Sequence, residues 1–354
     1  MRNISAHAQT LEIAFDHAVE QCCVPLDRLR LGFIRALGPL GQELVRNQEL
    51  RVAVTGFLVI GVALFFCLTI PLWQLALGPI LFGVAHLLAD FRYCVARPGF
   101  HRRPELVLAC GLPMVAMALG ASLAVGLLAV MAGFLLANGA LWKRIIGASA
   151  ALGVALLVHF AGYTADLIFA HVHNIVAIVA WWGWRGRTNR THWWVLALFA
   201  LAWMALMGGV FDPVYQHLWS VQWGPEQLGM EEHRRFLGMG YDGIWGVRLI
   251  LAFALAQSVH YFMWIRMVPE EARGRPTPRT FRASWKDVRM EMGGWVLIGT
   301  FIVAVALAVW ALFDLVEARA NYLQFIRFHG VLEFAAIAVV CVEGRSVFQN
   351  SAPS

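Results

Sequence analysis

Residues 52–70 read VAVTGFLVIGVALFFCLTI, a run of 19 residues without a charge that ends immediately before Pro71. An apolar run of about 18 or more residues is long enough to cross a membrane as a helix. Similar runs recur along the 354-residue chain, which is 60% hydrophobic and 14% charged and has a mean hydropathy of +0.64. This composition excludes a soluble enzyme. The sequence therefore predicts an all-α, polytopic integral membrane protein.

Ten such runs are expected to form one transmembrane helix bundle that covers residues 52–343. Their expected ranges are 52–70, 72–94, two spans within 106–142 that divide near Gly120, two within 145–184 that divide near Gly162, 193–210, 244–267, 293–313 and 322–342.

Lysine and arginine collect in alternate loops of this arrangement, which hold 22 of the 28 basic residues. Because basic loops stay on the cytoplasmic side, the pattern predicts a multi-pass protein of the cytoplasmic (inner) membrane with both termini in the cytoplasm. The net charge of +6 is spread over small clusters and forms no stripe with interleaved aromatic residues. A nucleic-acid partner is therefore excluded, and membrane lipids are the expected neighbours.

Four segments lie outside the predicted spans. Residues 1–51 carry apolar residues at helical intervals and predict amphipathic helices on the cytoplasmic face, with docking to a soluble partner as the alternative. Residues 268–290 form a basic cytoplasmic loop, and residues 344–354 form a short cytoplasmic tail. Residues 211–243 form an outward loop long enough to be a lid or a binding element, unless it is a plain surface connection.

Histidine is concentrated at membrane depth. Six of the twelve histidines fall within predicted spans, accompanied by two aspartates, one asparagine and one glutamate. These residues are His86, His159, His171, His173, His260, His329, Asp90, Asp166, Asn174 and Glu333. Ionisable side chains are costly in hydrocarbon, and they usually face the interior of a bundle where they serve ion, proton, ligand or metal chemistry.

The spacing of these residues indicates which of them lie on the same face of a helix. His86 and Asp90 are four residues apart, on one face of a helix, and His329 and Glu333 repeat the arrangement. His171 and His173 are two residues apart and point about 200° away from each other on a helix, so they do not serve one site together. His173 is seven residues beyond Asp166 and is the preferred inward-facing member.

This residue set suits a first-row transition metal, because neutral imidazole and carboxylate are good ligands for such ions. The predicted metal ligands are His86, His173, His260 and His329, the predicted catalytic carboxylates are Asp90 and Glu333, and the secondary candidates are His159, His171 and Asp166. A rise of about 1.5 Å per residue spreads them over several depths, so a two-metal site, or one metal with proton-relay residues, is expected.

Iron is the expected metal, since histidines and a carboxylate leave positions open for dioxygen. The leading hypothesis is a non-haem metal-dependent oxidoreductase or oxygenase that acts on a hydrophobic small molecule or lipid. Three alternatives stay open. The same residues could form the proton or solute path of a transporter, act as polar contacts in a purely structural subunit, or clamp haem between His86 and His260 or between His159 and His329.

Several other chemistries are excluded by missing motifs. The six cysteines show no CxxC or CxxCH spacing, so iron-sulfur clusters and covalently attached haem are not expected. The chain also contains no HExxH pair and no phosphate-binding loop.

The segment from Gly83 to Asp90, GVAHLLAD, resembles the early glycine, histidine and aspartate motif of the membrane carotene-cleaving dioxygenases of the Brp/Blh family. Those enzymes are polytopic and use histidine-bound iron, so the resemblance implies an iron-binding role for His86. It covers eight residues, and the later paired histidines of that family are absent from this sequence.

Overall fold

The computed structural model describes residues 2–184, 191–214, 229, 233, 237–241, 243–273 and 277–344, and all regular structure in these residues is helical. The helices are α1 Arg2–Ala36, α2 Gly38–Arg46, α3 Gln48–Thr69, α4 Pro71–Gly78, η1 Pro79–Gly83, α5 Val84–Asp90, η2 Phe91–Ala96, η3 Phe100–Arg102, α6 Pro104–Ala118, α7 Leu123–Leu136, α8 Leu141–Ala161, α9 Tyr163–Trp184, α10 Thr191–Met207, α13 Ile244–Phe262, η5 Met263–Met267, α14 Val268–Glu271, α15 Phe281–Met292, α16 Gly294–Phe313, α17 Leu315–Ile326 and α18 Phe328–Glu343.

Among the described residues, seven helical stretches are long and apolar enough to cross a membrane, and three shorter apolar helices accompany them. The seven are Gln48–Thr69, Pro71–Ala96, Leu141–Ala161, Tyr163–Trp182, Ile244–Glu271, Gly294–Phe313 and Leu315–Glu343, and the shorter three are α6, α7 and α10. The all-helical class is confirmed, and the seven helices support a multi-pass membrane protein. The count of ten spans, the side on which the termini lie and the identity of the membrane stay predictions.

Proline and glycine divide the helices where the sequence predicts. Pro71 begins α4, because a proline fits the first turn of a helix, where its missing N–H has no intrahelical partner. Gly120 has φ of 106° between α6 and α7, and Gly162 has φ of 54° between α8 and α9. Residues with a Cβ rarely adopt positive φ, so these two glycines permit the chain to reverse.

Two of the long stretches contain π-helical turns. Pro71–Ala96 contains the π-helical segments η1 and η2 on either side of α5, and Ile244–Glu271 contains the π-helical segment η5 after α13. Such wider turns shift the register of the side chains that follow, and they occur frequently at functional sites. Both stretches contribute histidines to the centre described below.

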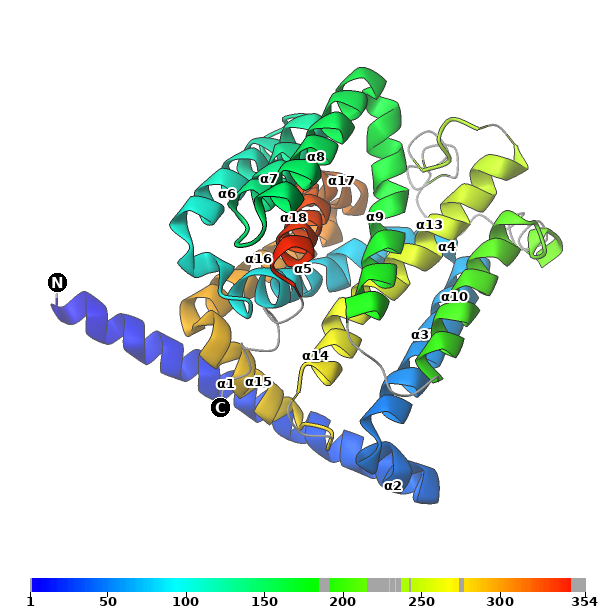
Figure 1. The fold of residues 1–354 in the computed structure, drawn as a ribbon. Coiled ribbons are helices and arrows are strands. Elements are labelled where there is room, and N and C mark those ends of the chain that lie inside the picture. The colour runs from blue at the N-terminus through cyan, green and yellow to red at the C-terminus, as the bar shows by residue number, and fades with distance from the viewer. Residues whose placement is uncertain are drawn as a thin grey trace.

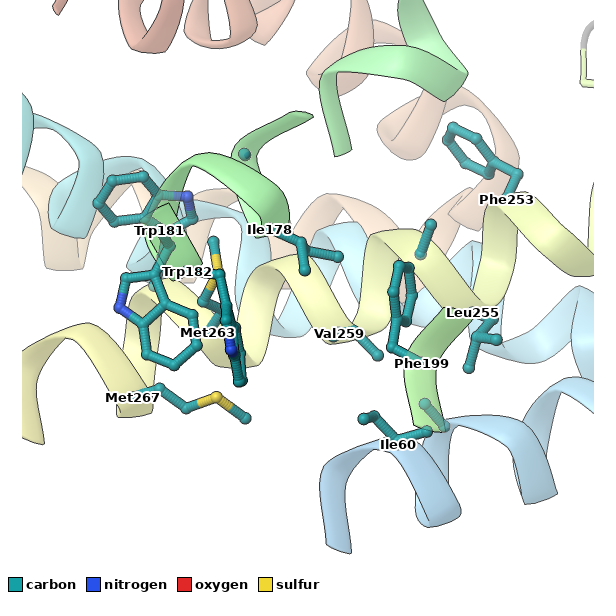
Figure 2. Close-up of a cluster of buried hydrophobic side chains, with 14 of the residues drawn as sticks. Ile60, Ile178, Trp181, Trp182, Phe199, Phe253, Leu255, Val259, Met263 and Met267 are labelled. Carbon is teal, nitrogen blue, oxygen red and sulfur yellow. The ribbon is translucent and has the colours of Figure 1, made fainter. Parts of the chain in front are cut away.

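Helix α13 lies inside the bundle, where it packs against α3, α9 and α10 (Figure 1). Figure 2 shows the apolar cluster on one side of it, and every side chain named next is buried. The cluster includes Ile60, Ile178, Trp181, Trp182, Phe199, Phe253, Leu255, Val259, Met263 and Met267. All side chains from Ile250 to Gln257 on α13 are buried, so neighbouring helices surround this part of the helix and fix the position of His260.

Helix α1 crosses one end of the bundle with α15 beside it (Figure 1). Arg289 on α15 pairs with Asp16 on α1 at 2.6 Å. At the other side of α15, Glu291 accepts hydrogen bonds from Arg92 at 2.8 Å and from Arg97 at 2.9 Å. The segment predicted as a basic loop therefore contains a helix, α15. Ion pairs connect α15 both to the N-terminal helix α1 and to the transmembrane bundle. Most of the predicted outward loop, and the tail from residue 345, lie outside the described residues.

Candidate metal centre

Four helices each bring one histidine to a common place inside the bundle. His86 comes from α5, His173 from α9, His260 from α13 and His329 from α18, and all four side chains are buried. The ring centroid of His86 lies 4.6 Å from that of His260 and 5.3 Å from that of His329. The ring of His173 lies 5.1 Å from that of His329 and 5.5 Å from that of His260.

Two carboxylates also reach this cluster of histidines. Asp90 follows His86 by one helical turn, and Glu333 follows His329 by one helical turn. Asp90 Oδ2 lies 3.2 Å from His86 Nε2, and Glu333 Oε1 lies 3.4 Å from His260 Nε2, across the helix interface. The ligand atoms of His86, His260 and His329 all lie within 4.8 Å of one another, and so do those of His86, Asp90 and Glu333. His86 belongs to both groups.

The spacing of these atoms matches the spacing of ligands around one ion. Neighbouring ligands at about 2.1 Å from a metal lie about 3.0 Å apart in octahedral geometry and about 3.4 Å apart in tetrahedral geometry. The two Nε2 atoms of His86 and His260 are 3.0 Å apart. Together with the 3.2 Å and 3.4 Å contacts to Asp90 and Glu333, this gives three pairs in the range expected for atoms that share an ion.

Backbone contacts set the tautomer of two of the rings. The Nδ1–H of His329 donates to the carbonyl oxygen of Ile326 at 2.7 Å, and the Nδ1–H of His173 donates to that of Phe169 at 3.1 Å. In a neutral imidazole the other nitrogen then carries a lone pair. Nε2 of His329 has no hydrogen-bond partner among the described residues. A carbonyl that orients the distal N–H of a histidine is the usual support for a metal ligand.

The two carboxylates are buried, and their polar neighbours include histidine nitrogens at 3.2 Å and 3.4 Å. Among the described residues, none of the four oxygens of Asp90 and Glu333 meets the geometry of a hydrogen bond, and both side chains are almost completely inaccessible. An unpaired buried carboxylate is expensive, which leads buried charges to pair or to coordinate metals. Neutral imidazoles and two ionised carboxylates carry a formal charge of −2, which a divalent cation neutralises.

A glycine permits the close approach that brings His173 to the centre. A Cβ added at Gly330 would lie 3.0 Å from the ring of Phe169 and 3.2 Å from Cδ2 of His173. These distances are tighter than ordinary van der Waals contact, so α18 approaches α9 this closely because residue 330 has no side chain. Gly330 directly follows His329 in the sequence.

The three secondary candidates lie away from the centre. His159 is exposed on α8, with its ring 5.6 Å from that of Phe160. His171 points to the other side of α9 from His173, where its Nε2 lies 2.8 Å from the carbonyl oxygen of Leu237. Asp166 pairs with Arg327 at 2.9 Å. The expected divergence of His171 and His173 therefore holds, whereas Asp166 does not accompany His173 to the site.

His86 and His260 are expected at a similar depth, and their rings lie 4.6 Å apart; His329 is expected at a different depth, yet its ring lies 5.3 Å from that of His86 and 6.3 Å from that of His260. The stretches that carry them are 26, 28 and 29 residues long. A helix needs about 20 residues to span hydrocarbon, so longer stretches tilt or bend and their midpoints do not mark a common plane. The π-helical segments and the break at Arg327 between α17 and α18 add further shifts, which bring the three rings to one level.

Tyr261 is a neighbour of the centre that the sequence pattern does not predict. The ring of Tyr261 lies 4.9 Å from that of His86, and its hydroxyl accepts a hydrogen bond from Gln257 at 3.4 Å. Tyr261 follows His260 directly, and adjacent residues on a helix point about 100° apart. Only the position of α5 beside α13 and η5 places both side chains against His86.

No protein-family model matches the chain, and neither do the curated proteins or the solved structures with which it was compared. The function is therefore argued from the centre itself.

Proposed function

We propose that this protein is a non-haem, metal-dependent oxidoreductase or oxygenase of the cytoplasmic membrane, with ten spans, that acts on a lipidic substrate. One observation carries the proposal: imidazoles from α5, α13 and α18 converge within 4.8 Å in the buried core, and Asp90 and Glu333 converge on the same histidine. Polar groups of this kind are placed inside a membrane bundle at a considerable energetic cost, and they usually serve function.

The residue set favours iron. Three neutral imidazoles with two carboxylates form a mixed nitrogen and oxygen donor set, which suits iron, manganese or zinc better than copper(I) or a cluster. Iron held by histidine and carboxylate keeps positions open, and its redox chemistry with dioxygen is what the protein would gain from it. In this proposal His86, His260 and His329 are ligands, with Asp90 and Glu333 as ligands or proton acceptors beside them. His173 completes the ring of imidazoles.

The separation of the histidines favours a non-haem ion over haem. Two axial nitrogens on opposite sides of one iron are about 4 Å apart, with the porphyrin between them. The Nε2 atoms of His86 and His260 are 3.0 Å apart, which is too close for a porphyrin to lie between them. The other pair considered for haem joins the exposed His159 to the buried His329.

The test is the metal content of the purified, detergent-solubilised protein after expression with added iron. Elemental analysis should give a stoichiometric amount of one transition metal, with no Soret band in the visible spectrum. His86→Ala, His260→Ala and His329→Ala should each lose most of this metal. His159→Ala is the matched control, because it removes an exposed imidazole from α8, and it should keep the metal content of the parent.

A folded parent protein that binds no transition metal, without exposure to a chelator, would overturn the proposal. It would favour a transporter that uses the same polar residues as a proton or solute path. Full metal content in all three alanine variants would show that the metal binds elsewhere. Oxidoreductase chemistry is tested separately, by dioxygen consumption when the iron-loaded protein is supplied with reductant and bilayer lipid.

A further inference from the structure

An apolar pocket with a cavity volume of about 140 Å³ lies between η2, α6 and α18. Helix α6 packs beside α18 (Figure 1). The pocket is lined by Phe91 and Cys94 from η2, by Val107 and Gly111 from α6, and by Leu332 and Ala335 from α18, among others. Every side chain on its wall is apolar or a thiol. The pocket therefore offers packing contacts and no charged or hydrogen-bonding partner.

The pocket is lined by residues that neighbour the candidate metal centre in sequence on two helical segments, η2 and α18. Cys94 follows Asp90 by one helical turn, and Leu332 directly precedes Glu333. Two residues that line the pocket, Cys94 and Leu332, thus lie within one helical turn of Asp90 and Glu333 respectively.

The outer side of the pocket is made by surfaces that face lipid. Phe91 is 37% exposed and Val107 is 45% exposed. Next to Val107 on α6, Leu108 and Leu112 are more exposed still, and α6 carries no charge beyond its first turn. Exposed apolar side chains of a membrane-embedded helix contact acyl chains, so the pocket opens towards the hydrocarbon and not towards water.

We propose that this pocket binds the end of an unbranched alkyl chain of a bilayer lipid and brings it to the metal centre. This inference rests on the proposed function and names the substrate class for the same site. A dry, apolar cavity of about 150 Å³ takes a ligand the size of benzene, so about six carbon atoms fill the pocket. Gly111 and Ala335 leave a space suited to a narrow chain, whereas a fused ring system of three times that carbon number does not fit.

Gly111 permits a direct test. A Cβ added there meets no atom within 4 Å, so a larger side chain extends into free space instead of displacing backbone. Gly111→Leu should therefore fill part of the pocket without disturbing the fold, and leucine is also the better helix former. Gly153→Leu is the matched control, because Gly153 is exposed on α8 and a Cβ there also meets no atom within 4 Å.

The full-length, metal-loaded protein is reconstituted in phosphatidylcholine bilayers that contain a fatty acid with a photoreactive diazirine at its terminal carbon. After irradiation, the labelled peptides are located by mass spectrometry. We expect labelling to concentrate on residues 91–114 and 332–339, and Gly111→Leu to lower it on the order of tenfold, as loss of a few methylene contacts does. Gly153→Leu should not change it. Val107→Trp, at the outer side of the pocket, is a second blocking variant.

Equal labelling of Gly111→Leu, Val107→Trp and the parent would overturn the pocket assignment, and so would labelling that is uniform over the lipid-facing surface of α16. The failure of this inference is distinguishable from failure of the proposed function. Stoichiometric metal without pocket labelling refutes the alkyl-chain site alone. Pocket labelling that Gly111→Leu removes, in a protein that never binds metal, supports the chain site and refutes the oxidoreductase.

Discussion

Glu333→Gln is expected to raise the thermal stability of the metal-free protein and to reduce the stabilisation that added metal provides. The substitution keeps the shape of the side chain and removes its charge. Oxygens of Asp90 and Glu333 lie within 4.8 Å of each other. Two unit charges at that distance would repel by about 3.5 kcal/mol at an effective dielectric constant of about 20. This is the upper limit of what the substitution relieves, because one of two buried carboxylates that share a site takes up a proton. Glu333→Gln removes this repulsion, so the metal-free variant should be more stable than the parent.

The expected shift in melting temperature follows from the size of the chain. At about 2 °C per kcal/mol, the metal-free variant should melt up to about 7 °C above the metal-free parent. A ligand present at about 1,000 times its Kd stabilises the parent by about 4 kcal/mol. If loss of the carboxylate weakens metal affinity about 100-fold, the same metal concentration stabilises the variant by only about 1.4 kcal/mol. Metal should therefore raise Tm by about 8 °C in the parent and by about 3 °C in the variant.

The assay is thermal unfolding in detergent, followed by the fluorescence of the chain's 15 tryptophans, with chelated protein and with iron(II) added under anaerobic conditions. Glu343→Gln is the matched control on α18. Glu343 lies 2.7 Å from Nη1 of Arg103 and accepts a hydrogen bond from the backbone N–H of Asn138 at 2.6 Å, so its replacement should lower Tm and leave the metal-induced shift unchanged.

The reasoning is refuted if Glu333→Gln lowers the Tm of the metal-free protein and keeps the full metal-induced shift. That result would mean that Glu333 stabilises the bundle through polar contacts between helices and is no part of a metal centre. A metal-free protein with raised Tm and an unchanged metal response would place the ion away from Glu333.

Further predictions concern His173 and the ion pairs that hold α15. His173→Ala should weaken metal affinity by about 10-fold to 100-fold, as loss of a neighbouring or supporting group does, while His171→Ala should leave it unchanged in the same metal titration. The guanidinium groups of Arg97 and Arg92 hold the pKa of Glu291 at about 2, below the ordinary value of 4.5. Because this folded-state pKa is lowered, the stabilisation is complete above pH 4.5 and is lost as pH falls from 4.5 towards 2. Protection of the α15 amides, measured as the exchange rate relative to the intrinsic rate at each pH, should then fall over that interval in the parent, whereas in Glu291→Gln it should already be low above pH 4.5.

The membrane class follows from local sequence alone. A stretch such as residues 52–70 has no charge over a length that spans hydrocarbon, and in lipid a helix is the only single segment that satisfies its own backbone groups. The helix breaks at Gly120 and Gly162 are also predictable from local sequence, since each depends on a single glycine that adopts positive φ. These features need no knowledge of the neighbouring helices.

The carboxylate that follows each of two histidines is also a local feature. Residues four apart share a helix face whatever the rest of the chain does, so the pairs His86 with Asp90 and His329 with Glu333 are visible in the sequence. The opposite directions of His171 and His173 follow from the same periodicity. Helical periodicity does not determine which of these two histidines faces the centre, because it fits either one equally well.

The assembly of the centre was decided by tertiary structure. Periodicity places each histidine on a face, but depth depends on the tilt of stretches up to 29 residues long, on the π-helical turns within two of them and on the break at Arg327. His260 meets His86 across 174 residues of sequence because packing fixes α13, and His173 reaches His329 because Gly330 permits α9 to approach α18. The sequence determined which residues are expensive to bury, since that cost belongs to each side chain. Only helix packing decided which of these residues come together at one site, since contacts between helices involve surfaces that are distant in sequence.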